Sequence, residues 1–324
     1  MTTQDDAPPV AGQPEAGRAA LPPFNRGAVE KMLARLQQAI QERGLTSEEE
    51  IQAYLHELMA DEAPLFPIGP LTPLDQAQDL IYDAWEEEDE SRRVQLARRA
   101  LKISPDCADA YSLLAEAADT LEKSRDLYQK GVQAGERALG ESFVELEGMF
   151  WGMLETRPYM RARFGLAHSL WLLGERRQAV AHLQEMLRLN PNDNQGLRYV
   201  LMNWLLERGE DQALGELLDR YPSDIAADWW YARALWLYRT QGASAEATRT
   251  LREAITRNGF VPLYLLGRKP LPDYLPDRVG IGTEDEAASY AAEALHAWRA
   301  SDGALTWLAQ QLAAPSRRGR RNKT

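Results

Sequence analysis

The sequence predicts an all-α fold, an α-solenoid of stacked helical hairpins with disordered termini. Segments with apolar residues at helical spacing follow one another with a period of about 34 residues. Almost no segment alternates apolar and polar residues with period two, so strands are not predicted. A composition that is 44% hydrophobic over 324 residues supplies enough apolar side chains for a buried core.

The clearest repeat covers residues 160–193. Counted from Met160 as position 1, the residues that fix its frame are Leu166 and Ala167 at 7 and 8, Gly174 at 15, Ala179 at 20, Leu187 at 28 and Pro191 at 32. This arrangement resembles a tetratricopeptide repeat. The resemblance implies a hairpin in which small residues at 8 and 20 let two helices approach closely, and in which the proline ends the second helix.

The same frame recurs along residues 74–261. Residues 228–261 match it well, whereas 74–107, the unit that begins at 108, and 194–227 match it only in part. In 194–227, Gly209 and Ala213 lie one residue closer together than in the other units, which predicts a shortened turn. Units this short must stack to bury their apolar faces. The alternative is an irregular helical bundle in which the spacing is accidental.

The N-terminal part predicts three further segments. Residues 1–23 are rich in Pro, Ala, Gly and acids, and should form a disordered lead-in. Residues 27–60 predict a helical pair, divided at Gly44, with Thr46 and Glu49 as the capping box of the second helix. Four prolines in 64–73 predict a linker. We expect the pair to dock in part on the repeats, because two helices alone are too small to be stable.

The C-terminal part departs from the repeat pattern. Pro262 should end the last hairpin, and further prolines bar a helix until Thr283, which can cap a helix that begins with three acids. Residues 262–312 are therefore predicted as a connection and a pair of helices that close the open end of the solenoid, and 313–324 as a basic, disordered tail.

This segment carries a second resemblance. The residues concerned are Val261-Pro262, Tyr264-Leu265-Leu266, Leu271-Pro272, the acidic turn from Gly282 to Glu286, and Trp298 followed by Gly303-Ala304-Leu305. They resemble the C-terminal region of the suppressor of tumorigenicity seven (ST7) family. The resemblance is sharp over 258–308 and diffuse over 75–308, and it implies a helical repeat protein without a known reaction. Eukaryotic relatives carry membrane segments; none is visible here, so a membrane location is not carried over.

Composition and motifs exclude several functions. The net charge of −12 argues against a general nucleic-acid binder, because phosphate binding needs a positive surface. The single cysteine, Cys107, excludes an internal disulfide and a Cys-based zinc site. No phosphate-binding loop, dinucleotide fingerprint, zincin motif or nucleophile elbow is present, so we predict neither enzymatic activity nor a cofactor or metal. With no signal peptide or membrane span in the sequence, we expect a cytoplasmic protein.

The candidate site is the concave face of the repeats. Positions 2, 5, 9 and 12 of each unit share one helix face, and this face changes from acidic near 75–119 to aromatic and basic at 161–239. The candidate groove residues are Arg161, Phe164, His168, Arg198, Trp229, Trp236 and Arg239. Arg and Trp dominate binding hot spots, and guanidinium groups suit carboxylates. The alternative is that these side chains pack between neighbouring helices.

The sequence thus predicts a non-enzymatic scaffold that recognises a segment of a partner protein, with an acidic segment as the best match. An accessory subunit of an enzyme, an enzyme with an unrecognised site, and a self-associating structural protein remain as alternatives. The five positive charges of 317–323 could attach to RNA, to anionic lipid or to the acidic repeats of the same chain. Neither the partner's identity nor the oligomeric state follows from the sequence.

Overall fold

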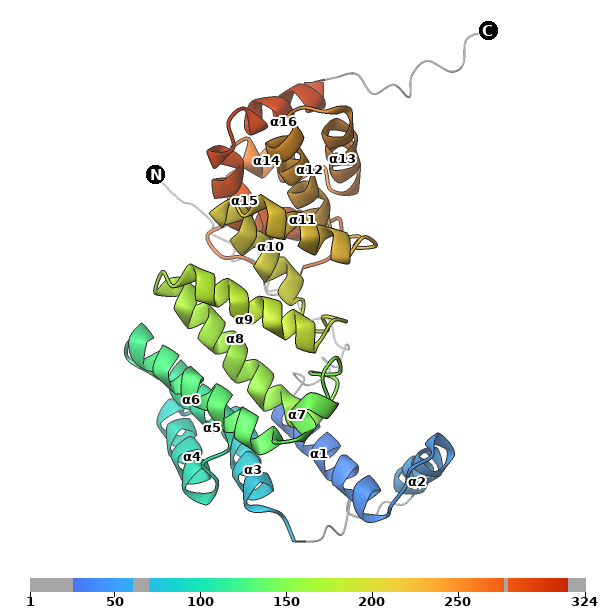
Figure 1. Ribbon diagram of the computed structural model, residues 1–324, viewed down its shortest axis with the longest axis vertical. Helices are drawn as coiled ribbons and strands as arrows, with labels where there is room; N and C mark the ends of the chain where they lie inside the picture. The colour runs from blue at the N-terminus through green and yellow to red at the C-terminus, as the bar shows by residue number, and fades with distance from the viewer. Residues whose placement is uncertain (1–25, 61–69, 277–278, 314–324) are drawn as a thin grey trace, which may run out of the picture.

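The computed structural model describes residues 26–60, 70–276 and 279–313. Over these residues the chain is an α-solenoid: it consists of helices and connections and contains no strand. Figure 1 shows an elongated stack that runs from α3 and α4 at one end to α16 at the other. The predicted lead-in 1–23 lies outside the described residues, as do residues 64–69 of the linker and 314–324 of the basic tail.

Five helical hairpins form the stack. Their first helices are α3 (Pro73–Glu86), α5 (Ala108–Glu116), α8 (Arg157–Leu172), α10 (Leu197–Arg208) and α12 (Ala227–Gln241). Their second helices are α4 (Glu90–Ile103), α6 (Leu121–Leu139), α9 (Arg176–Leu189), α11 (Asp211–Arg220) and α13 (Ala245–Arg257). We call the surface built by the first helices the inner face.

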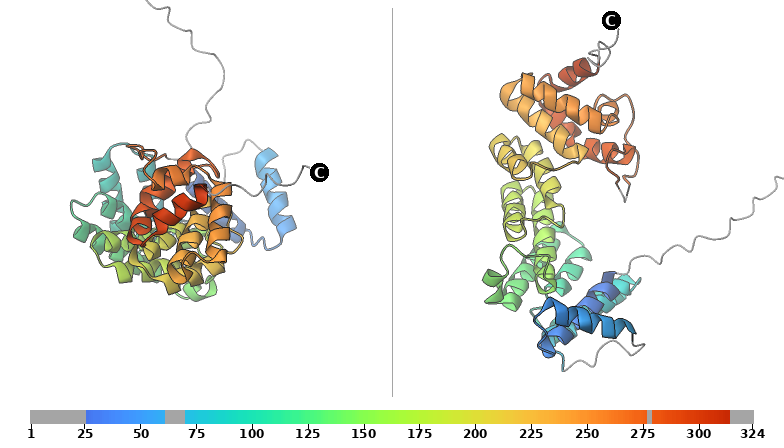
Figure 2. Two further views of the ribbon diagram at one scale, coloured as in Figure 1. Left: turned by 90° about the horizontal axis from the view of Figure 1, so that it is seen from above. Right: turned by 90° about the vertical axis from the view of Figure 1, so that its right-hand side faces the viewer.

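The remaining helices lie outside the repeats. They are α1 (Arg26–Glu42), α2 (Glu48–Ala60), α7 (Ser142–Glu145), the short 3₁₀ helix η1 (Leu154–Thr156), α14 (Val261–Leu265), α15 (Glu284–Ala300) and α16 (Ala304–Ala313). Of the predicted helical pair 27–60, α1 lies along the stack, whereas α2 projects away from it (Figures 1 and 2).

Local side chains set the helix starts. Thr72 and Asp75 form a capping box at α3, with Pro73 in the first turn. Thr283 caps α15 by accepting from the backbone N–H of Glu286, as the sequence predicts. Two predicted boundaries are wrong. The capping box of α2 uses Ser47 and Glu50 in place of Thr46 and Glu49, and Pro262 opens the extra helix α14, because its fixed φ suits a first helical turn.

Small side chains allow the helices to approach one another. Ala167 and Ala179, the small residues of the clearest repeat, are both fully buried. The turn between α10 and α11 is the shortened one that the spacing predicts, and its Gly209 adopts a φ of 70°, which favours glycine. Sequence spacing therefore predicts both the contacts and the turns of the hairpins.

The buried side chains form two hydrophobic clusters. The smaller cluster lies in the first hairpin and α5, and consists of Ala77, Ile81, Ala84, Ala97, Ala100, Cys107, Ala110 and Leu113. The larger cluster runs without a break from α6 to α16 and contains the largest rings, including Trp298, Tyr159 and Tyr231. The N-terminal end of the stack is thus packed mainly with alanine.

A helix from outside the repeats lies at each end of the inner face. Helix α1 contacts α3, and α15 contacts α10 and α12. The sequence predicts only that α15 caps the last hairpin. In the structure α15 also covers part of the inner face. The buried Glu286 carboxylate explains its position, because it accepts hydrogen bonds from the backbone N–H groups of Ala227 in α12, at 2.9 Å, and of Gly282, at 2.8 Å.

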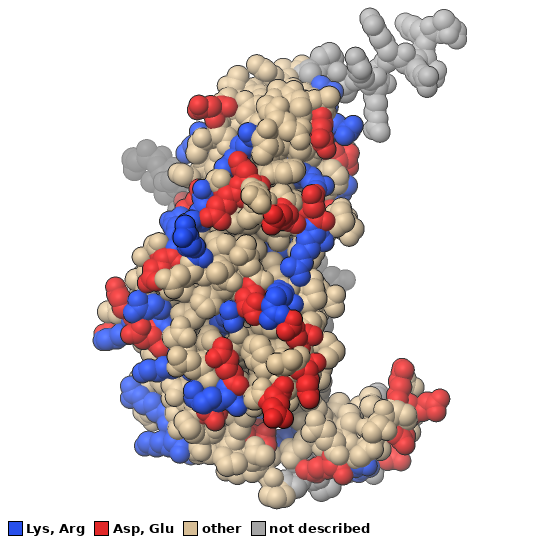
Figure 3. All heavy atoms as spheres, in the orientation of Figure 1, with Lys and Arg blue, Asp and Glu red and all other residues tan. Residues whose placement is uncertain are grey.

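Charged side chains of both signs are interleaved over the face that Figure 3 shows. Several of them join one hairpin to the next: Arg176 pairs with Glu207, and Arg137 with Asp106. Exposed pairs of this kind contribute little stability each, about 0–1 kcal/mol. Among the described helices, none combines the length and apolarity required to cross a bilayer.

Candidate partner-binding cleft

An open cleft of about 540 Å³ lies on the inner face at α5, α6 and α8. Its apolar and aromatic lining residues are Trp85, Leu113, Leu121, Tyr128, Trp151, Phe164 and Leu172. Its polar and charged ones include Asp109, Ser112, Glu116, Arg161, His168 and Gln195. Three of the seven predicted groove residues, Arg161, Phe164 and His168, therefore line this cleft.

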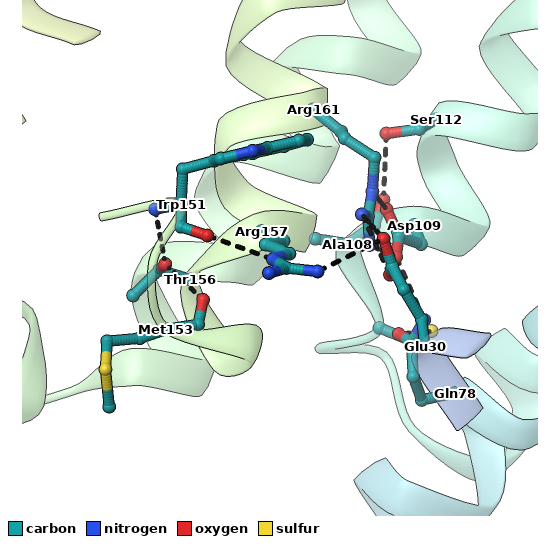
Figure 4. Close-up of polar contacts among 11 residues, drawn as sticks. Glu30, Gln78, Ala108, Asp109, Ser112, Trp151, Met153, Thr156, Arg157 and Arg161 are labelled. Atoms are coloured by element: carbon teal, nitrogen blue, oxygen red, sulfur yellow. Dashed lines mark hydrogen bonds and ion pairs between the residues drawn. The ribbon is translucent and has the colours of Figure 1, made fainter. Parts of the chain in front are cut away.

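Arg161 lies at one end of the cleft between two carboxylates (Figure 4). Its Nε donates to Oδ1 of Asp109 at 2.7 Å, and its Nη1 donates to both carboxylate oxygens of Glu30 at 3.1 Å. The Trp85 ring lies 4.8 Å from the guanidinium carbon. Asp109 comes from α5 and Glu30 from α1, so this arginine of α8 joins three helices that are distant in sequence.

The electrostatics keep Arg161 charged. Burial lowers the pKa of the guanidinium. The charges of Asp109 and then Glu30 raise the pKa by more than burial lowers it, so that the pKa lies above its ordinary value. A second arginine of α8, Arg157, lies 3.7 Å from Glu30. Two arginines thus face two carboxylates, and the Asp109 side chain is only 1% exposed. The cluster is balanced in charge only while α1 is in place.

The rest of the cleft is amphipathic. Phe164 is half-buried and His168 is exposed, one helical turn apart on α8. Two apolar side chains at the cleft, Leu121 and Leu172, are 42% and 52% exposed. Tyr128 of α6 packs directly over Gly165, where a Cβ atom would collide with its ring. A ligand in this cleft would meet apolar surface beside hydrogen-bonding groups.

The other four predicted groove residues make contacts within the stack. Arg198 donates to Asp224 at 2.7 Å and to Asp193 at 2.8 Å, which raises its pKa. Arg239 pairs with Asp211 at 3.1 Å and donates to the Leu206 carbonyl.

The two tryptophans of this set also pack inside the stack. Trp229 is 3% exposed, between the rings of Tyr199 and Tyr221. Trp236 lies over Gly215 and donates to the Asp211 carbonyl at 2.8 Å. These two residues and the two arginines therefore make contacts within the stack, and Arg239 also lines an open pocket with Tyr238 and Asp302.

Most residues of the site, Leu121 and Leu172 among them, are absent from the predicted set, and three further examples show why. Glu30 lies outside the repeats, Tyr128 on a second helix, and Trp151 in the connection before α8. Repeat spacing carries no signal for Glu30 or Trp151. Gly165 is the available signal for Tyr128, because a glycine inside a helix indicates close approach of a neighbouring group.

The described residues contain no group of three or more His, Cys, Asp or Glu side chains arranged to hold a metal ion. Cys107 is buried against α3, and burial raises its thiol pKa to about 12. A thiol with so high a pKa carries almost no thiolate at neutral pH, and is therefore a poor nucleophile.

Several known proteins are similar to this chain in sequence. A family model described as ST7 protein matches residues 39–147. The chain is 27% identical to the human suppressor of tumorigenicity 7 protein-like over 300 residues, which are 82% of this chain and 50% of that protein. It is 26% identical to the ST7 homolog of Drosophila pseudoobscura pseudoobscura over 300 residues, 81% of this chain and 53% of that protein.

The chain is similar to the ST7 family. The family model matches from the end of α1 to α7, whereas the sequence led us to expect the sharpest resemblance at 258–308, outside this match. The alignments with the relatives cover most of the chain. The chain spans about half the length of the curated relatives it matches. Among solved structures, YrrB, described as a TPR protein with an unusual peptide-binding site, is similar with a TM-score of 0.40 and 18% identity, over 63% of this chain and 90% of that one.

Proposed function

We propose that this protein is a non-enzymatic scaffold that binds an extended or helical segment of a partner protein in the cleft at α5, α6 and α8. A tetratricopeptide-like stack suits this role, because its short repeats expose a long, continuous inner surface. The repeats at α10 and α12 contact α15 on this surface, and α3 contacts α1. The cleft is open and lies between these two contacts along the chain.

The observation that carries the proposal is the pair of half-exposed leucines at the cleft. Leu121 and Leu172 come from α6 and α8 and are 42% and 52% exposed. Exposed apolar side chains beside a concave surface are typical of protein-binding sites. An apolar side chain of the partner would enter between Phe164 and the leucines, while His168 and Gln195 would hydrogen-bond to its backbone or polar groups.

Acidic partner residues fit only one part of this site. Arg198 and Arg239 are used in ion pairs within the stack. Arg161 already binds Asp109 and Glu30, so a carboxylate of the partner would have to take the place of Glu30. The proposed partner therefore binds first through an apolar anchor.

The test is a quantitative affinity capture with the full chain. Leu121→Asp and Leu172→Asp add charge to the cleft at exposed positions and should leave the fold intact. The matched control is Val144→Asp, an apolar residue of α7 that is 74% exposed and does not line the cleft. The partner should be captured equally by the wild type and by V144D, and at least about tenfold less by the L121D/L172D variant. Equal capture by all three proteins would refute the proposed site.

A further inference from the structure

Helix α1 is attached to the inner face through polar contacts. Lys31 pairs with Asp83 at 2.8 Å, Arg35 pairs with Asp79, and Gln37 donates to Glu155 at 3.1 Å. With Glu30 and Arg161, these contacts reach α3, η1 and α8. Most of them are exposed or partly buried, where an ion pair contributes about 0–1 kcal/mol.

Most of the apolar side of α1 is only partly buried. Neither hydrophobic cluster contains a residue of this helix. Leu33, Leu36 and Ile40 are only half-buried, and Met32 is 46% exposed. Of the described residues of α1, Gly27, Glu30 and Ala39 are buried. Helices of globular proteins normally gain most of their stability from burying such a stripe.

A partly open cleft of about 480 Å³ lies between α1 and the repeats. Arg35 and Gln38 of α1 line it on one side, and Gln78 and Tyr82 of α3 and Pro158 of α8 on the other. Well-packed protein interiors leave few voids larger than a water molecule. Helix α1 thus covers this part of the inner face without filling it, and such a contact is weak for its length.

The charges on the surface beneath α1 determine which helices can bind there. With α1 removed, Arg157 and Arg161 would face the single carboxylate of Asp109, which is almost wholly buried. At that point positive charge would exceed negative charge, whereas Asp79 and Asp83 of α3 would lose the cations with which α1 pairs them. A negative side chain at the position of Glu30 restores the balance and satisfies both guanidinium groups.

We infer that α1 is a tethered ligand of the inner face, and that this site accepts, in exchange for α1, a partner helix with a carboxylate opposite Arg161. The inference rests on the proposed function, since the partner segment would enter the adjoining cleft. Because α1 and the repeats belong to one chain, α1 acts at an effective concentration of about millimolar, so an exchanging partner must bind more tightly than α1 itself.

The experiment uses a peptide of residues 26–42 as the probe. The peptide is acetylated, amidated and labelled with fluorescein, and a second peptide carries Glu30→Gln. Fluorescence anisotropy measures its binding to three full-length chains: the wild type, Glu30→Lys and Glu49→Lys. Glu30→Lys places a cation against Arg157 and Arg161 and releases the tethered helix. Glu49→Lys makes the same change of charge at an exposed position of α2.

The probe should bind E30K at least about tenfold more tightly than it binds the wild type or E49K, because the tethered competitor has been released. The E30Q peptide should bind E30K at least about tenfold more weakly than the native peptide, because it leaves the buried arginine without its second carboxylate. Equal binding to all three chains, or binding to none, would overturn the inference.

Amide hydrogen exchange of the wild type gives a second readout that does not depend on the folding of E30K. Amides of residues 28–42 should exchange at least about 100-fold faster than those of α8, because local opening exposes them. Equal protection of α1 and α8 would show that α1 is a fixed part of the core, which contradicts the inference. Neither experiment involves the partner, so its failure would leave the capture result with the leucine variants unaffected.

Discussion

Single buried charges decide much of the behaviour of this inner face. Arg161 has a side chain that is 12% exposed, yet its charge is matched by Asp109 and Glu30. Removing one member of such a cluster leaves an uncompensated buried charge, which typically costs about 3–5 kcal/mol. An alanine variant of Arg161 would therefore confuse binding with unfolding. For this reason the test of the cleft changes exposed leucines, and Glu30 is changed only where release of α1 is the intended effect, with hydrogen exchange of the wild type as a second readout.

Asp228 in α12 is a buried acid whose charge, unlike that of Arg161, has no partner of opposite sign among the groups that shift its pKa. Its Oδ1 is buried and accepts no hydrogen bond from the described residues, and burial, followed by the charges of Glu286 and Glu293, raises its pKa to about 8. Between about pH 4 and 8 the folded protein therefore keeps a proton that the unfolded chain has lost. The contribution of Asp228 to stability is present below pH 4 and is lost as the pH rises towards 8.

Asp228→Asn should remove this pH dependence. We expect the melting temperature of the variant to match that of the wild type near pH 4, and to exceed it by at least about 2 °C at pH 8. Thermal unfolding followed by circular dichroism between pH 4 and 8 measures the difference. The control is Asp273→Asn, an exposed acid that should follow the wild-type profile throughout. A constant difference between D228N and the wild type at every pH would contradict the prediction.

At the scale of the helix, close approach shapes the cleft. Tyr128 of α6 fills the space over Gly165 of α8, and Gly131 and Gly135 of α6 approach α8 in the same way. Gly165→Ala would drive a methyl group into the phenol ring, and we expect it to lower the free energy of unfolding by about 1–3 kcal/mol. Urea denaturation measures this value.

A second variant separates this collision from a helix-propensity effect. In a chain that carries Tyr128→Ala, adding Gly165→Ala should cost much less, or should even stabilise, because alanine is the better helix former and the ring is absent. A loss of the same size in both backgrounds would show that the Tyr128 ring does not restrict this position.

Sequence spacing predicted elements that repeat and missed those that occur once. The frame of Met160 to Pro191 placed Arg161, Phe164 and His168 on the inner face, where they line the cleft. It could not show that α15 covers α10 and α12, because that position depends on Glu286 accepting from Ala227, 59 residues away in sequence. Glu30 and Arg161, 131 residues apart, are joined in the same way. Repeat spacing predicts which residues lie side by side in successive repeats. It does not predict contacts between residues that are far apart in the sequence.

On the scale of the whole molecule, the stack is unevenly packed. In a solenoid each repeat contacts only its neighbours, so stability is close to a sum of local contributions. The smaller cluster at α3 to α5 is mostly alanine, whereas the larger one is rich in leucine, tyrosine and tryptophan. Less apolar area is buried at the N-terminal end, and we expect α3 and α4 to open before the rest of the stack.

Two core variants test this local character. Ile81 of α3 and Leu205 of α10 are both fully buried, in the smaller and the larger cluster respectively. Replacement of either by alanine should cost about 2–5 kcal/mol. Hydrogen exchange measured by mass spectrometry shows where the loss appears. Ile81→Ala should speed exchange in α3 and α4 and leave α12 and α13 unchanged, because four hairpin boundaries separate them. Leu205→Ala should speed exchange from α8 to α12, since α10 contacts α9, α11, α12 and α15.

If Ile81→Ala speeds exchange in α12 and α13 as much as in α3, the molecule unfolds as one cooperative unit. In that case a partner helix could not replace α1 without unfolding the repeats that α1 covers.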